Sequence, residues 1–245
     1  MKFSVPPTLD IEVHRHSVGA PWTYAMLEKR QNAIAHVVFE EGLEGKVIIS
    51  EVSPVVTIGR RTDIDDLIWE PEAFQNQGVE ILNVDRGGLA TYHGPGQWVL
   101  FVVESLEKLT GDTRGVQAAV FGLLEVAKRA AEKFSGEKFN VRAGKEQGLW
   151  NFRGEKVASV GVHVRNGVLL HGICVNGYKT ERSFAGIRPC GLESPMGYLI
   201  STEDIRARNE SFGRLGKILL EETFETGLNA QKARVSLPVC GETSS

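Results

Sequence analysis

The chain has 245 residues, of which 42% are hydrophobic and 24% charged, a composition typical of a globular protein with one domain. Its formal net charge of −3 argues against nucleic-acid binding as the main function. No apolar run approaches the roughly 20 residues of a membrane-spanning helix, and the N-terminal residues resemble neither a signal peptide nor a transit peptide. We therefore expect no nucleic acid and no membrane among its partners.

Strands and helices are expected to alternate along the chain. Residues 22–41 have the apolar spacing of a helix, which Pro21 would begin and Gly42 would end. A polar connection with a short helix is expected over residues 63–78. Several segments rich in apolar and β-branched residues are expected as strands. They are residues 5–15, 46–52, 55–58, 81–84, 98–103 and 149–152.

A glycine-rich segment lies between the strands at 81–84 and 98–103. Residues 86–101 read RGGLATYHGPGQWVLF, with four glycines between an arginine and the second strand. Glycine lets the main chain pass close to a ligand and reaches backbone angles that other residues resist. A simple Gly/Pro turn is the alternative interpretation. The density of glycines, together with the fixed charge of Arg86 and the imidazole of His93, favours a binding loop.

Three helices are expected in the second half of the chain, the first of which would cover the sheet. Its apolar residues recur at i, i+3, i+4 and i+7, with Asp112 or Thr113 as N-cap and Gly136 as C-cap. The tail after Leu237 is expected to be frayed. The three helices are residues 116–134, 203–209 and 212–226.

Residues 157–176 are expected to form a β-hairpin, because Asn166-Gly167 is a favoured dipeptide for a type I′ turn. A two-residue turn would place Gly161 opposite Gly172. Two facing glycines leave a notch, which a sheet keeps mainly where a ligand or another backbone comes close. A longer turn or a bulge would break this register. The other expected pairs are Arg165 with Val168, Val162 with His171, and Ser159 with Cys174.

The three cysteines have neither a disulfide framework nor a metal-binding spacing, and the histidines form no ligand cluster. We therefore expect a reducing compartment and no metal. Cys174 is expected to be a small buried residue, and Cys240 to be incidental. Cys190 lies in a loop over residues 177–197, close to Arg188. A reactive thiol needs access and a nearby cation, although an isolated Pro-Cys-Gly is more often structural than catalytic.

The glycine-rich segment resembles a known family. The string RGG-x-x-TYHGPGQ at residues 86–97 is similar to the signature of the lipoyl(octanoyl) transferases, the octanoyl-[acyl carrier protein]–protein N-octanoyltransferases. The turn TIGRR at residues 57–61 resembles a family turn that lies beside the acyl pocket. The resemblance covers residues from about 12 to about 220, the expected core of a single catalytic domain over residues 1–245.

Two catalytic residues are implied by the resemblance. Cys190, which follows the HG-x-x-x-N strand, matches the cysteine that carries the acyl thioester. Lys156 opens KVASVG, which is similar to the family strand whose lysine forms a Cys–Lys dyad. An ammonium near sulfur stabilises the thiolate, and a lysine with a lowered pKa can pass protons. Without the resemblance, Lys156 would be read as a solvated surface residue.

The implied reaction is a ping-pong acyl transfer from octanoyl-[acyl carrier protein] to a lysine of lipoyl domains, without cofactor or ATP. The acceptors would be the lipoyl domains of 2-oxoacid dehydrogenase complexes and the glycine cleavage H protein. Leu89 and Tyr92 are expected as walls of an apolar acyl slot, and His93 and His171 as positioning residues. The implied substrate-binding residues are Arg86, Gly87, Gly88, Leu89, Ala90, Thr91, Tyr92, His93, Ser159, Val160, Gly161, His171, Gly172 and Ile173.

The resemblance also implies the fold, an α/β domain like the catalytic domain of lipoate– and biotin–protein ligases, with a mixed sheet flanked by helices. The chain departs from the family pattern after Asn176, where Thr180 replaces the usual acidic residue. An ATP-dependent lipoate–protein ligase of the same fold and a non-catalytic carrier-binding protein are the alternatives. The short N-terminus favours a cytoplasmic enzyme, with the mitochondrial matrix as the second choice.

Overall fold

The computed structural model describes residues 3–62, 66–188 and 195–224. The helices in these residues are α1 Tyr24–Glu40, α2 Pro71–Asn76, α3 Leu106–Thr110, α4 Val116–Ser135 and α5 Ile205–Thr223. The strands are β1 Asp10–Arg15, β2 Lys46–Glu51, β3 Val55–Ile58, β4 Glu80–Asn83, β5 Thr91–His93, β6 Gln97–Val103, β7 Asn140–Arg142, β8 Gly148–Trp150, β9 Lys156–Arg165 and β10 Val168–Asn176.

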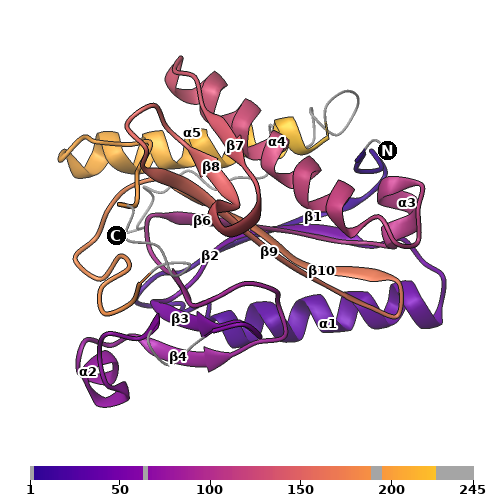
Figure 1. Ribbon diagram of the computed structural model, residues 1–245, viewed down its shortest axis with the longest axis horizontal. Helices are drawn as coiled ribbons and strands as arrows, with labels where there is room; N and C mark the ends of the chain where they lie inside the picture. Colours follow the sequence, from indigo (N-terminus) through magenta and orange to yellow (C-terminus); the bar gives the residue numbers. More distant parts are fainter. Residues whose placement is uncertain (1–2, 63–65, 189–194, 225–245) are drawn as a thin grey trace.

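A seven-stranded mixed sheet forms the centre of the molecule, with the strand order β1-β2-β6-β10-β9-β8-β7. Helices α4 and α5 lie on one face of this sheet and α1 on the other (Figure 1). A second sheet, of order β4-β3-β5, lies beside α1. The predicted α/β class with a mixed sheet and flanking helices is confirmed, but the second sheet was not expected.

Strand β2 shows why the central strands are apolar on both sides. Val47 and Ile49 pack into the cluster with α4 and α5, whereas Ile48 packs into the cluster with α1. All three side chains are fully buried. A strand covered on both faces reads as a continuous apolar run, which is how this segment appears in the sequence.

The β9–β10 hairpin has the predicted register. Asn166 and Gly167 form the turn with φ angles of 53° and 75°, as a type I′ turn requires. Gly161 lies opposite Gly172. The other three predicted pairs, Arg165–Val168, Val162–His171 and Ser159–Cys174, are also present.

Several predicted boundaries were wrong. The first strand begins at Asp10, because Pro6 and Pro7 have no N–H to donate to a ladder. Helix α4 is capped at its start by Gly115, while the Asp112 carboxylate accepts from the Arg114 backbone N–H in the preceding turn. The two expected C-terminal helices are one continuous helix, α5. The expected end of that helix and the expected frayed tail lie outside the described residues.

Helix α1 begins two residues after the expected start. Thr23 is its N-cap, and the Thr23 side chain accepts a hydrogen bond from the Met26 backbone N–H. Glu41 rather than Gly42 is the C-cap. None of the helices in the described residues is sufficiently long and apolar to cross a bilayer.

Candidate active site

A pocket lies over the centre of the sheet, on the face that α1 covers. The space open to the centre of a water-sized sphere is about 40 Å³. The floor consists of two rows of residues across β6, β10 and β9, and the glycine-rich loop closes over them. The rows are Val99, Cys174 and Ser159, and Phe101, Gly172 and Gly161.

The glycine-rich loop packs directly onto β9. The Gly87 N–H donates to the Val162 carbonyl at 3.0 Å. A Cβ atom on Gly161 would lie 2.9 Å from the Gly87 carbonyl oxygen, which is closer than real Cβ contacts allow. The facing glycines therefore do make room for another backbone, as their register predicted. A Cβ atom on Gly172 would lie 2.1 Å from the Leu100 carbonyl oxygen of the neighbouring strand.

Arg86 holds the loop in place. Its guanidinium donates to the Thr57 carbonyl at 2.7 Å, to the Leu89 carbonyl at 2.8 Å and to the Gly87 carbonyl at 3.1 Å. The same group also donates to the Thr57 hydroxyl. Arg86 thus joins β3 to both ends of the turn before β5, and its buried charge lies in the pocket wall.

A buried hydrogen-bond network determines which ring nitrogen of His93 carries the proton. Asn176 donates its amide N–H groups to the carbonyls of Lys156 and Gly197, so its oxygen faces Gln97. Gln97 donates to that oxygen and to the Tyr92 carbonyl, so its own oxygen lies 2.7 Å from His93 Nδ1. His93 Nδ1 must therefore carry the proton, and its Nε2 is an acceptor.

Burial and the Arg86 charge lower the pKa of both pocket histidines. The pKa values of His93 and His171 fall to about 3, since a buried imidazolium loses hydration and lies near the Arg86 cation. Both rings are neutral at physiological pH. Burial also raises the pKa of the Tyr24 hydroxyl, so that group is neutral too.

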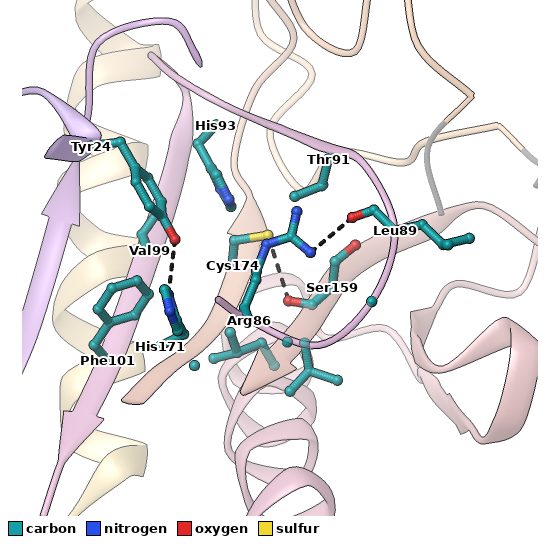
Figure 2. A pocket seen from close by; sticks show the side chains of 15 residues that line it. Tyr24, Arg86, Leu89, Thr91, His93, Val99, Phe101, Ser159, His171 and Cys174 are labelled. Carbon is teal, nitrogen blue, oxygen red and sulfur yellow. Dashed lines mark hydrogen bonds between the residues drawn. The ribbon is translucent and has the colours of Figure 1, made fainter. Parts of the chain in front are cut away.

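The pocket has two chemically different sides, which Figure 2 shows on either side of the Arg86 guanidinium. On one side lie Thr91 and Ser159, whose buried hydroxyl oxygens have no hydrogen-bond partner within the described residues. On the other side lie the rings of Tyr24, Phe101 and His171. The hydroxyl of Tyr24 and Nδ1 of His171 are 3.1 Å apart and satisfy each other.

Lys156 is buried at the start of β9. Its backbone N–H donates to the Pro195 carbonyl at 3.0 Å, and its carbonyl accepts from the Gly197 N–H at 2.9 Å. The Lys156 side chain lies close to Gly148 and over the Trp150 ring. Lys156 is therefore tied to the segment that follows Cys190 in the sequence. Cys190 itself lies outside the described residues, as does Cys240.

Most of the predicted binding residues surround one pocket. Tyr92 does not, because its ring packs on Phe184 in a separate apolar cluster, and Gly87 and Ala90 are also not in the lining. The predicted residues in the lining are Arg86, Gly88, Leu89, Thr91, His93, Ser159, Val160, Gly161, His171, Gly172 and Ile173.

Four pocket residues were not predicted as site residues. They are Tyr24, Val99, Phe101 and Cys174. One feature of the sequence indicates that α1 takes part in the site. Gln31 is a polar residue on the buried face of α1, seven positions after Tyr24. A buried polar side chain needs a polar partner. No group of three or more possible metal ligands occurs in the described part of the chain.

Comparison with known proteins identifies the family of the chain. The chain matches the lipoyl protein ligase A/B catalytic domain over residues 26–205. It is 34% identical to an octanoyltransferase of Magnetococcus marinus, over 92% of this chain and 96% of that protein. It is 31% identical to an octanoyltransferase of Bdellovibrio bacteriovorus, over 80% of this chain and 91% of that protein. The chain belongs to the octanoyltransferase family.

Membership of this family confirms the resemblance that the glycine-rich segment indicated. The protein is therefore an enzyme that transfers acyl groups in protein lipoylation. Its fold is that of the lipoate–protein ligases. A crystal structure of lipoate–protein ligase A bound with ATP superposes with a TM-score of 0.62 at 12% identity, covering 92% of each chain. At that identity the likeness concerns the fold alone.

Proposed function

We propose that this enzyme transfers an octanoyl group from octanoyl-[acyl carrier protein] to a lysine of lipoyl domains, through a thioester on Cys190. The observation that carries the proposal is the polarity of the pocket. The buried hydroxyls of Thr91 and Ser159 have no partner among the residues that the structure describes, and they offer hydrogen bonds to a carbonyl. The aromatic side beyond Arg86 offers apolar surface to an alkyl chain, for which each buried CH₂ contributes about 0.8 kcal/mol.

Lys156 is the proposed partner of Cys190. Cys190 precedes Pro195 by five residues, and Pro195 accepts a hydrogen bond from the Lys156 backbone. This short tether supports a reaction centre near the start of β9. Proton transfer from the thiol to the Lys156 amine would give a thiolate beside an ammonium, in which each charge stabilises the other.

The first half-reaction forms the acyl-enzyme. The Cys190 thiolate attacks the thioester carbonyl, the bond to the phosphopantetheine sulfur breaks, and the leaving thiolate takes the proton from Lys156. Negative charge develops on the carbonyl oxygen in this step. The Thr91 and Ser159 hydroxyls are the proposed side-chain donors to that oxygen.

The second half-reaction regenerates the enzyme. The ε-amine of the acceptor lysine attacks the Cys190 thioester, the sulfur leaves as thiolate, and the amine proton passes to Lys156. Because a thioester is converted to an amide, the reaction needs no ATP. We propose the lipoyl domains of 2-oxoacid dehydrogenase complexes and the glycine cleavage H protein as acceptors, and the cytoplasm as the compartment.

A transfer assay separates this proposal from an ATP-dependent ligase. The enzyme is incubated with octanoyl-[acyl carrier protein] and an apo lipoyl domain, and the mass of the domain is measured with and without ATP. We expect an octanoyl increment of equal yield in both conditions. We also expect more than 10³-fold slower transfer by Cys190→Ala, whereas Cys240→Ala serves as the matched control and keeps the wild-type rate. Modification only with ATP and free octanoic acid would contradict the proposal, and no modification in either condition would favour a carrier-binding protein.

A further inference from the structure

His171 breaks the side-chain alternation of β10. Leu169 and Ile173 face the cluster with α4 and α5, so an odd-numbered neighbour should face that side too. His171 instead contacts Tyr24 and Phe101 on the pocket face. Its φ of 59° lies in the left-handed region, which is costly for a residue with a Cβ atom. This backbone conformation accounts for the change of face.

Helix α1 holds this strained conformation. The His171 N–H, which is turned out of the ladder, donates to the side-chain oxygen of Gln31 at 2.8 Å. One helical face of α1 also supplies Tyr24, whose hydroxyl bonds to the His171 ring. Two side chains of one rigid helix therefore fix both the backbone and the ring of a single residue. Strain maintained in this way is typical of functional sites.

The rings around His171 close one end of the pocket. His171 and Phe101 meet edge to face at 5.5 Å, and Tyr24 stacks on His93 at 5.2 Å. Tyr24, Phe101 and His171 are each no more than 3% exposed. By contrast, Gly88, Leu89 and Gly161 in the same lining are partly exposed, so the pocket opens where the glycine-rich loop meets β9.

The length of β9 between Ser159 and the level of His171 is close to that of an eight-carbon chain. His171 lies opposite Val162 in the register of β9 and β10. Val162 follows Ser159 by three residues on β9, a distance of roughly 10 Å at 3.3 Å per residue. The seven carbons beyond the carbonyl of an octanoyl group span roughly 9 Å as an extended zigzag of 1.5 Å bonds. A carbonyl bound by the Ser159 hydroxyl would therefore place the last carbon against the Tyr24–His171 pair.

We propose that the hydrogen-bonded pair Tyr24–His171, backed by Phe101, is the stop that limits the acyl chain to about eight carbons. The proposal rests on the proposed function and names the specificity-determining residues of its pocket. A longer chain would have to separate the Tyr24 hydroxyl from His171 and leave both groups buried without a partner. It would also have to move helix α1, which the Gln31 contact holds to β10.

The test compares acyl chain lengths in wild type and in Tyr24→Leu, which removes the ring and opens the end of the pocket. The yield of acyl-enzyme is measured by intact mass with acyl carrier protein bearing chains of 8, 10, 12 or 14 carbons. Each buried CH₂ changes affinity about fourfold, so the dodecanoyl-to-octanoyl ratio should rise at least ~10-fold in Tyr24→Leu. Phe101→Leu, a second opening variant, should shift the ratio in the same direction.

Leu27→Ala is the matched control. Leu27 is a buried residue of the same helix and the same apolar cluster but is not in the pocket lining. Its truncation makes a cavity elsewhere and should leave the ratio unchanged. The proposal is overturned if folded Tyr24→Leu and Phe101→Leu keep the wild-type ratio, or if Leu27→Ala shifts it equally.

A binding measurement separates failure of the stop from failure of the proposed reaction. The thermal stabilisation of each variant by free octanoic, dodecanoic and tetradecanoic acids is measured, which requires no catalysis. We expect octanoic acid to stabilise wild type most, and the longer acids to gain most in Tyr24→Leu. If wild type forms no acyl-enzyme but this binding pattern appears, the proposed reaction is overturned and the proposed limit on chain length is retained. If acyl-enzyme forms but chain length has no effect in either readout, the stop fails alone.

Discussion

Gly172 shows how tightly the strands behind the pocket pack. Its missing Cβ atom would lie 2.1 Å from the Leu100 carbonyl oxygen, and a strand carbonyl in a central ladder cannot move far. Gly172→Ala should therefore lower the free energy of unfolding by about 2 kcal/mol or more, as measured by urea denaturation.

Gly213 provides the control for that substitution. It lies within α5, and a Cβ atom there would meet no atom within 4 Å. Gly213→Ala should raise the free energy of unfolding by about 0.5–1 kcal/mol, because alanine is the better helix former. Equal effects of the two substitutions would show that the notch around Gly172 is not tightly packed.

Features determined by neighbouring residues could be predicted from the sequence, whereas features determined by residues far away in the chain could not. The Gly161–Gly172 pair follows from the Asn166-Gly167 turn a few residues away, so its register was predictable. The turned side chain of His171 depends on Gln31 and Tyr24, which are 140 and 147 positions away in sequence. No periodicity within β10 encodes that contact.

At the scale of elements, an ion pair connects β1 and β2 to the glycine-rich loop. Arg15 donates to one oxygen of the buried Glu51 carboxylate from Nε and Nη2, both at 3.1 Å. The other oxygen accepts from the Gly96 N–H at 3.0 Å. The Gly96 carbonyl in turn accepts from the backbone of Gly177 and Tyr178, at the start of the segment that leads to Cys190.

Removing the Arg15 cation should destabilise the protein, because the buried Glu51 carboxylate would keep only the Gly96 N–H as a partner within the described part of the chain. We expect Arg15→Met to lower the free energy of unfolding by about 2–4 kcal/mol in urea denaturation. Arg206→Met, which removes an exposed pair with Glu210 on α5, should change it by less than about 0.5 kcal/mol. A loss below 1 kcal/mol for Arg15→Met would contradict a structural role of the pair.

Helix α4, the β9–β10 hairpin and strand β3 were predicted from the sequence, whereas β5, β7 and α3 were not. Helix α4 and the β9–β10 hairpin carry enough residues for their periods to be recognised. Strands β5 and β7 have three residues each, and α3 has five, so their sequences contain no measurable period. These elements form because tertiary contacts pair them, as β3 does for β5.

At the scale of the molecule, the pocket is assembled from segments that no local pattern connects. The glycine-rich loop supplies its cover, the β9–β10 hairpin and β6 its floor, and Tyr24 at the start of α1 its closed end. The first two were recognisable because their residues match the signature of a family. The contribution of α1 arises from the order of the strands, which places β6 and β10 beneath that helix. The order of strands in a sheet cannot be predicted from the sequence of any single segment.

In the proposed reaction the acyl group passes through Cys190 with the help of Lys156. The most direct test of this proposal is the intact mass of the enzyme after mixing with octanoyl-[acyl carrier protein] in the absence of ATP and of any acceptor. We expect an increment of one octanoyl group that hydroxylamine removes and that is absent in Cys190→Ala. In Lys156→Met the increment should form at least ~100-fold more slowly. An octanoyl increment that persists in Cys190→Ala, or no increment while the lipoyl domain is still modified without ATP, would contradict the proposal.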